Sequence, residues 1–246
     1  MRFVGQEYRG KNVLVALIDS GVDSAHPSLK STSIEGYSLS LRATNHVAID
    51  PNFHDEHGHG TKMALHLLRF APEVRILAIK ITDTSLRASS DLIASGIELA
   101  YKGGASVINV SMGTPNMGRA MLLRDCTLAA MEHNALVVAS AHPMGQRAYP
   151  ADLPEVVGVS SNKKCLGGLF HLPKRHYPRK KWKSLSDKFI APGDFDGSYA
   201  GVSFAAARVS AYLACLKEAM PDHSCDDVLA ALKNKAHWPT VELGYL

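Results

Sequence analysis

The sequence predicts a doubly wound α/β fold, with a mostly parallel sheet and helices on both faces. Short runs that are nearly all apolar and rich in β-branched residues recur along the chain, and segments with apolar residues at helical spacing separate most of them. Runs of this composition are typical of parallel strands buried on both faces, and the helices between them supply the crossover connections. The expected strands are residues 12–18, 73–81, 105–112, 135–141 and 155–161.

The helical segments differ in how their apolar residues are distributed. The first has Met63, Leu67 and Phe70 on one face, and the second ends at a pair of glycines. The third is apolar nearly all the way round, so we expect it to run through the core. The fourth begins with Ser224, a residue type that caps helices. These helices are expected at residues 60–71, 89–104, 201–219 and 224–236.

The chain of 246 residues is interpreted as a single domain, 1–246, with a basic surface insertion at about 162–188. Six Lys or Arg residues lie between Lys174 and Lys183, mixed with aromatic residues. This mixture occurs in grooves for single-stranded nucleic acid, but the segment matches no recognised RNA or DNA module. The formal net charge of +4 is also small. We therefore interpret this segment as a solvated loop in preference to a nucleic-acid-binding segment.

Three polar residues occupy the places where an open parallel sheet gathers its active site, beyond the carboxyl ends of the strands. Asp19 follows the first expected strand, His59 opens the first helix, and Ser203 opens the buried helix. Acyl transfer needs these residue types together, because an imidazole must take the serine proton and a carboxylate must fix the imidazole tautomer. The alternative is that Asp19 caps a turn and Ser203 caps its helix.

A cluster of histidines raises the possibility of zinc. His54, His57, His59 and His66 are close in sequence, but they form no HExxH motif or other fixed ligand pair. The cysteines also lack a metal-binding spacing and do not form a dense disulfide framework. We therefore expect no metal and no cofactor. The cysteines are Cys126, Cys165, Cys215 and Cys225.

The motifs around the three polar residues resemble those of the subtilase family of serine proteases, which share the order Asp, His, Ser. The resemblance spans nearly the whole chain and implies a subtilisin-like fold. The matching stretches are "VALIDSGVDSAHPSL" around Asp19, "GHGTKMA" around His59, "ASVINVSMG" at 105–113, "IAPG" at 190–193 and "GVSFAAARVSAYLACL" around Ser203.

The resemblance implies a serine endopeptidase that cleaves a protein or peptide substrate. Asp19 would orient His59, His59 would act as general base and then general acid, and Ser203 would attack the peptide carbonyl to form an acyl-enzyme. An enzyme that transfers the acyl group to an amine would use the same residues, and the sequence leaves the two reactions open.

The resemblance also implies a substrate-binding strand. Ser111, Met112 and Gly113 match the family segment that pairs with the substrate backbone by β-augmentation. The same stretch also has the composition of a core strand, and the two interpretations are compatible because one end can be buried while the other is exposed.

The sequence departs from the family pattern at the expected oxyanion donor. His142 and Pro143 stand where the family has glycine and asparagine, and proline has no donor. His142 is a candidate to replace the asparagine as oxyanion donor. The alternative is that it is a loop histidine facing solvent. Val202 and Ala207 also replace the usual threonine and proline around Ser203. These departures keep open a catalytically weak or inactive relative that uses its cleft as a peptide-binding module.

Other features bear on calcium, location and specificity. The segment before residue 73 lacks a loop that holds calcium in many relatives, so no calcium site is expected there. The sequence has no apolar stretch long enough for a membrane span, and no signal peptide or propeptide precedes the first motif. These features favour a cytoplasmic protein, or the catalytic domain of a larger one. The basic insertion predicts a preference for acidic substrate residues.

Overall fold

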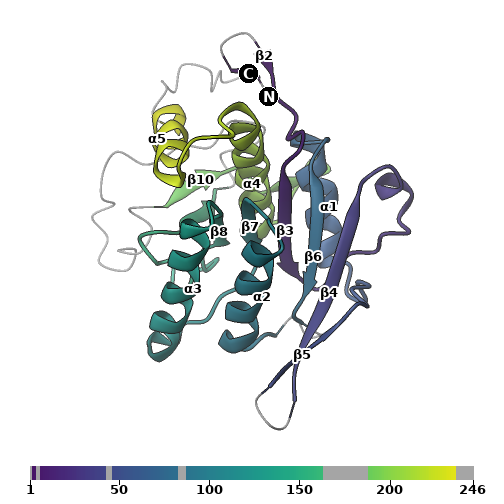
Figure 1. The fold of residues 1–246 in the computed structure, drawn as a ribbon, viewed down its shortest axis with the longest axis vertical. Helices are drawn as coiled ribbons and strands as arrows, with labels where there is room; N and C mark the ends of the chain where they lie inside the picture. Colours follow the sequence, from purple (N-terminus) through teal and green to yellow (C-terminus); the bar gives the residue numbers. More distant parts are fainter. Residues whose placement is uncertain (1, 4–5, 43–45, 83–86, 163–187, 237–246) are drawn as a thin grey trace.

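The computed structural model describes residues 2–3, 6–42, 46–82, 87–162 and 188–236 (Figure 1). Its centre is an eight-stranded sheet in the order β10-β9-β8-β7-β3-β6-β4-β5. All neighbouring pairs in this sheet are parallel except β4 and β5, which pair antiparallel. The strands are β3 (Leu14–Asp19), β4 (Ile34–Leu41), β5 (Val47–Asp50), β6 (Arg75–Lys80), β7 (Val107–Val110), β8 (Leu136–Ser140), β9 (Val157–Ser161) and β10 (Phe189–Ala191).

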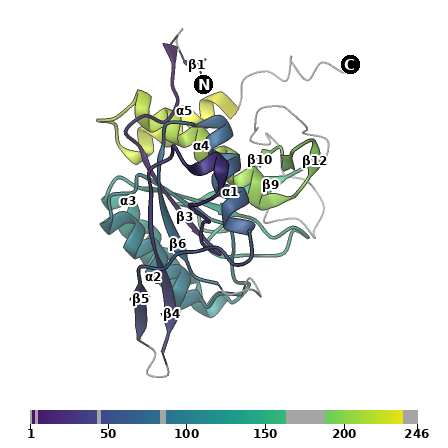
Figure 2. The same ribbon diagram turned by 90° about the vertical axis from the view of Figure 1, so that its right-hand side faces the viewer.

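Helices cover both faces of the sheet, so the predicted doubly wound α/β fold is confirmed (Figures 1 and 2). Alternate residues of β3 point to two separate cores: Val15 and Leu17 to one, Ala16 and Ile18 to the other. This alternation explains why the strand is apolar throughout, since both of its faces are covered. The first core lies under α1 (His59–Phe70), α4 (Val202–Ala219) and α5 (Cys225–Ala236), and the second under α2 (Ser90–Lys102) and α3 (Ala120–Glu132).

Helix α4 runs through the core, as its composition predicts. Every residue from 204 to 217 is buried, including two charged ones. Both charged side chains have partners: Arg208 pairs with Asp194 at 3.0 Å, and Lys217 Nζ donates to Asn134 Oδ1 at 2.7 Å. These contacts offset the cost of removing the charges from water.

The structure contains elements that the sequence interpretation did not include: α3, the β4–β5 hairpin and β10. In α3 the amphipathic pattern is blurred, because Met121 and Leu128 are apolar yet exposed, Met121 by 61%. In β4, serines and Gly36 interrupt the apolar residues. Gly36 is required there, because a Cβ at this position would lie 2.3 Å from the Ala78 carbonyl oxygen. The short remaining elements are β1 (Arg2–Phe3), β2 (Gln6–Glu7), β11 (Asp194–Phe195), β12 (Ser198–Tyr199) and the 3₁₀ turns η1 (Pro27–Leu29) and η2 (Met117–Arg119).

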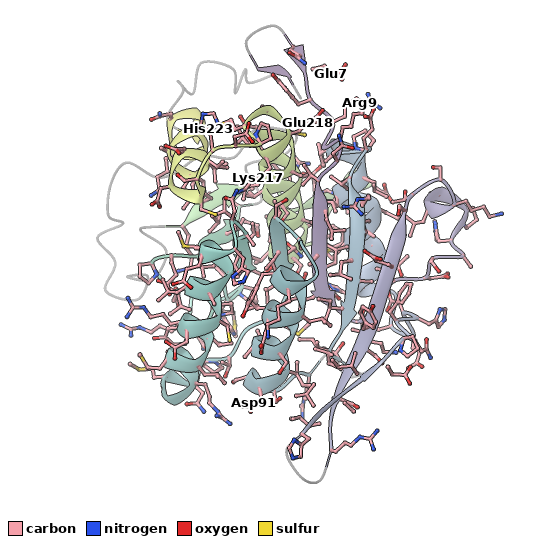
Figure 3. The ribbon with its side chains drawn as sticks, viewed as in Figure 1. Glu7, Arg9, Asp91, Lys217, Glu218 and His223 are labelled. Atoms are coloured by element: carbon pink, nitrogen blue, oxygen red, sulfur yellow. The ribbon has the colours of Figure 1, made fainter. Side chains whose placement is uncertain are left out.

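The last turn of α4 is tied to the start of the chain. Glu218 Oε2 accepts hydrogen bonds from the backbone N–H groups of Arg9 and Gly10, at 2.7 and 2.6 Å. Figure 3 shows Arg9 and Glu218 at one end of the molecule and Asp91, in the first turn of α2, at the opposite end. Because α2 and α4 both begin at the carboxyl edge of the sheet, this tether lies at the far edge from the expected active site.

Several expectations fall partly or wholly outside the described residues. These include the basic insertion, except for its ends, and Cys165. The cysteines that the structure describes, Cys126, Cys215 and Cys225, are free thiols. Within the described ranges, no helix combines the length and apolarity that crossing a membrane requires.

Candidate active site

The predicted aspartate and histidine lie together at the carboxyl edge of the sheet. His59 Nδ1 donates a hydrogen bond to Asp19 Oδ1 at 2.7 Å. Asp19 is completely buried, and its second oxygen, Oδ2, has no hydrogen-bond partner among the described residues. A buried carboxylate in this contact fixes the histidine tautomer, with its proton on Nδ1 and a lone pair on Nε2.

The local backbone explains how this pair forms. Asp19 is the last residue of β3, and His59 is the first residue of α1, which packs on β3. The two segments can approach because Gly60 has no side chain: a Cβ there would lie 2.1 Å from the Gly21 carbonyl oxygen. The glycine after His59 is therefore a steric requirement of the site.

The charges around His59 favour its protonated form. Burial alone lowers the pKa of His59, but the hydrogen bond and charge of Asp19 raise it, with a smaller contribution from Asp55, so the pKa lies above its ordinary value. Lys62, three residues further along α1, opposes this rise. A base with a raised pKa holds the proton of a nucleophile more strongly.

Ser203 occupies a different place on its helix from the one that a capping role requires. It is the second residue of α4, and Gly201 is the N-cap, with φ of 122° and no side-chain capping bond. The hypothesis that Ser203 caps the helix is therefore wrong, because a capping side chain must precede the first helical residue. Its hydroxyl instead donates to the carbonyl oxygen of Ser111 at 3.5 Å.

Ser203 lies near His59 without bonding to it. Among the residues that the structure describes, no hydrogen bond joins the two side chains. The ring of Phe204, the next residue, lies edge-on to the His59 ring, with centroids 6.5 Å apart. The structure therefore brings Asp19 and His59 into contact and places Ser203 on the adjoining helix.

The residues of the predicted substrate-binding strand follow β7. Ser111 and Met112 are half-buried, and Gly113 is exposed. Gly113 lies so close to Tyr149 that a Cβ would come within 2.8 Å of its carbonyl oxygen. Thr114 then forms an antiparallel bridge with Tyr149. The assignment of Ser111, Met112 and Gly113 to substrate binding stays a prediction.

His142 and Pro143 lie just beyond β8, the neighbour of β7. His142 is half-buried, and its Nδ1 accepts a hydrogen bond from the backbone N–H of Met144 at 3.2 Å. Pro143 is exposed. No contact described in the structure joins His142 to Ser203, and its role as an oxyanion donor stays a prediction.

Asp55 is a residue of the site that the sequence interpretation missed. It is 7% exposed and lies in the loop before α1, where its carboxylate accepts hydrogen bonds from both sides of the site. Burial opposes ionisation, but these hydrogen bonds, led by the one from Thr61, lower the pKa of Asp55 below its ordinary value. The available signal was a carboxylate four residues before His59, close to a helix start.

His66 belongs to the predicted histidine cluster but faces the core behind the site. It is 0% exposed, and neither ring nitrogen has a hydrogen-bond partner among the described residues. The rings of Phe70, Phe195 and Phe204 surround it, with centroids 5.2, 5.9 and 5.4 Å away. Across the described ranges, no three His, Cys, Asp or Glu residues form a group suited to a metal ion.

His66 is expected to make stability depend on pH. Burial first, then the charges of Arg208 and Arg69, lower its pKa to about 4, although Asp194 opposes them. Between pH 6.5 and 4 the unfolded chain therefore binds a proton that the folded chain does not, so stability falls as the pH falls. His66→Phe should reduce the loss in the free energy of unfolding between pH 7 and pH 4 by up to about 3 kcal/mol, as measured by urea denaturation.

The exposed His46 supplies the control for this measurement. His46→Gln should leave the pH dependence of the free energy of unfolding unchanged. A His66→Phe variant with the same pH dependence as the native chain would show that His66 is not responsible.

This chain is thus an α/β protein whose mostly parallel sheet carries a hydrogen-bonded aspartate–histidine pair at its carboxyl edge. A family model described as the subtilase family matches residues 10–245. The chain belongs to this family, which makes it a member of the subtilisin-like serine proteases.

Curated relatives agree with this assignment. Subtilisin NAT of Bacillus subtilis subsp. natto is 28% identical over 249 residues, covering 94% of this chain and 62% of that protein. The chain thus spans less than two thirds of that relative. Subtilisin of Bacillus pumilus is 28% identical over 241 residues, covering 94% of this chain and 86% of that protein.

Two solved structures share the fold. An S41 psychrophilic protease has a TM-score of 0.73 and 23% identity, covering 95% of this chain and 85% of that one. A lanthipeptide protease has a TM-score of 0.67 and 23% identity, covering 92% and 82%. At these identities the likeness concerns the fold alone.

Proposed function

We propose that the chain is a serine endopeptidase that hydrolyses peptide bonds through an acyl-enzyme on Ser203. The observation that carries this proposal is the 2.7 Å hydrogen bond between His59 Nδ1 and the buried Asp19. It leaves His59 Nε2 as the base, beside the start of the helix that carries Ser203. Rotation of the Ser203 hydroxyl away from Ser111 and toward His59 completes the triad.

In the proposed reaction, Ser203 Oγ attacks the carbonyl carbon while His59 Nε2 takes its proton. His59 then gives this proton to the leaving amine as the C–N bond breaks, which leaves the acyl-enzyme. A water molecule attacks the ester with His59 again as base, the acid product departs, and Ser203 recovers its proton. Asp19 stabilises the imidazolium in both halves of the reaction.

Two donors are proposed for the oxyanion. One is the backbone N–H of Ser203, at the positive end of α4. The other is His142. Because its Nδ1 accepts the Met144 N–H, the neutral ring carries its proton on Nε2, which is then available to donate.

His142→Phe is expected to lower the acylation rate about 10²-fold, near the lower limit of the loss measured for removal of the oxyanion asparagine in a subtilisin. The phenylalanine keeps an aromatic ring but has no donor. Stopped-flow acylation by a p-nitrophenyl ester measures the rate. His142→Asn supplies the control, since its amide can accept from Met144 and still donate. Equal rates for native chain and His142→Phe would remove His142 from the oxyanion site.

The second candidate function is a catalytically weak peptide-binding module, favoured by the absence of a donor at Pro143. Acyl transfer to an amine is a third candidate, which shares the acyl-enzyme. Labelling with a fluorophosphonate tests the proposal, because the reagent reacts with an activated serine. Mass mapping should find the label on the Ser203 peptide of the folded chain and not after unfolding. An unlabelled folded chain would favour the binding module.

A further inference from the structure

The Asp55 carboxylate joins the two segments that carry the proposed base and its orienting aspartate. Oδ1 accepts from the Ser20 hydroxyl at 2.9 Å and from the backbone N–H groups of His57 and Gly58, at 3.1 and 2.7 Å. Oδ2 accepts from the N–H and hydroxyl of Thr61, at 2.8 and 2.6 Å. A carboxylate that is 7% exposed and accepts five hydrogen bonds is held in a fixed position.

These contacts replace the missing cap of α1. Gly58 is the N-cap residue, has φ of 86° and supplies no side-chain capping bond. The first turn of a helix leaves N–H groups without intrahelical partners, and Asp55 accepts the one from Thr61. His59 is the first residue of this helix, so its backbone position depends on the Asp55 contacts.

Ser20 links this loop to the orienting aspartate. Its hydroxyl donates to Asp55 and accepts from the Gly60 N–H at 2.9 Å, and its own N–H donates to Asp19 Oδ1 at 2.7 Å. Ser20 therefore contacts Asp55 and the residue after His59 through its side chain, and Asp19 through its backbone N–H. The neighbouring hydroxyl of Thr61 extends the link by accepting the N–H of Asp23 at 2.9 Å.

We propose that Asp55 is a positioning residue of the triad, which fixes the start of α1 against the end of β3 through Ser20 and adds a second negative charge near His59. This inference rests on the proposed function. Four groups from the surrounding elements face the imidazole: Asp19 on β3, Asp55 and His57 in the loop, and Lys62 on α1. Asp55 is the second carboxylate of this set.

Two consequences separate this role from general structural support. Removing the charge of Asp55 lowers the pKa of His59, because one of the charges that favour the imidazolium is lost. His59 acts as base only when neutral. In a variant without the Asp55 charge, labelling of Ser203 by the fluorophosphonate should therefore begin at lower pH than in the native chain. The reduced precision of the triad should lower the plateau rate about 10- to 100-fold, since small misplacements of catalytic groups are costly.

The test measures the fluorophosphonate labelling rate between pH 4 and 9 for the native chain and three variants. Asp55→Asn should lower the plateau of the labelling rate. It should also move the acid limb of the pH profile, where the rate rises to this plateau, to lower pH. Ser20→Ala removes the link without changing charge, so it should lower the plateau rate and leave the limb in place. Glu56→Gln removes an exposed carboxylate next in the chain and should change neither quantity.

The outcomes are distinguishable. A native chain without labelling contradicts the proposed function itself. A native chain that labels, with an Asp55→Asn variant whose circular dichroism is native and whose acid limb has not moved, overturns the inference alone. If Asp55→Asn does not fold, Ser20→Ala tests the inference in its place. A plateau rate unchanged in Ser20→Ala then overturns the inference.

Discussion

Ser203→Ala is expected to lower peptide hydrolysis about 10⁶-fold, the loss measured when the nucleophile of a subtilisin is removed. In the proposed mechanism Ser203 Oγ forms the acyl-enzyme, and its neighbours cannot compensate for its loss, because His59 then has no proton to accept. Alanine is a good helix former, so α4 should keep its second residue without strain. The hydrogen bond to Ser111 is long, and its loss should cost little stability.

The measurement is the release of a fluorophore from a peptide library, together with fluorophosphonate labelling of the same preparation. Ser198→Ala is the matched control, since Ser198 is an exposed serine on β12. It should retain both activities. Residual hydrolysis above about one thousandth of the native rate would contradict the role of Ser203 as nucleophile, provided that no other protease is present.

Asp19→Asn is expected to lower hydrolysis about 10⁴-fold, close to the losses known for the corresponding change in serine proteases. The side chain is buried and almost isosteric, so the geometry should persist. An amide that turns its NH₂ group toward His59 forces the ring proton onto Nε2, and the base then faces Ser203 with a donor in place of a lone pair. The defect should lie in kcat rather than in KM.

The decisive readout for this variant is the ¹⁵N chemical shift of the His59 ring, which distinguishes the two tautomers. The native chain should carry the proton on Nδ1, and Asp19→Asn should carry it on Nε2. Asp23→Asn serves as the control, because Asp23 lies in the loop that follows Asp19 and is half-exposed. An Asp19→Asn variant with native kcat would remove Asp19 from the catalytic unit.

Parts of this structure could be predicted from the sequence because their chemistry is local. The β-branched runs predict buried parallel strands, and the sheet confirms them with ends shifted by one or two residues. The stretches around Asp19 and His59 predict a pair, and a hydrogen bond joins them. Motifs of this kind succeed because a glycine such as Gly60 is needed wherever two backbones approach closely.

Other parts depend on contacts between distant segments, and a sequence does not display them. Asp55 reads as one more polar residue in "HDEHGHGT", and its importance comes from Ser20, thirty-five residues earlier in the chain. His66 has the helical spacing of a core residue, but its surroundings come from Phe195 and Phe204. The alternative that Ser203 caps α4 fails for a related reason, since Gly201 is the N-cap and its conformation is a backbone property.

The tether between Glu218 and the backbone of Arg9 and Gly10 determines where this molecule can be modified safely. Ser203 and Glu218 are fifteen residues apart on α4, which corresponds to about 22 Å at the α-helical rise. A fluorophore or affinity tag attached ahead of Arg9 therefore emerges about two nanometres from Ser203. Such a probe would report on the folding of α4 from a point remote from Asp19, His59 and Ser203.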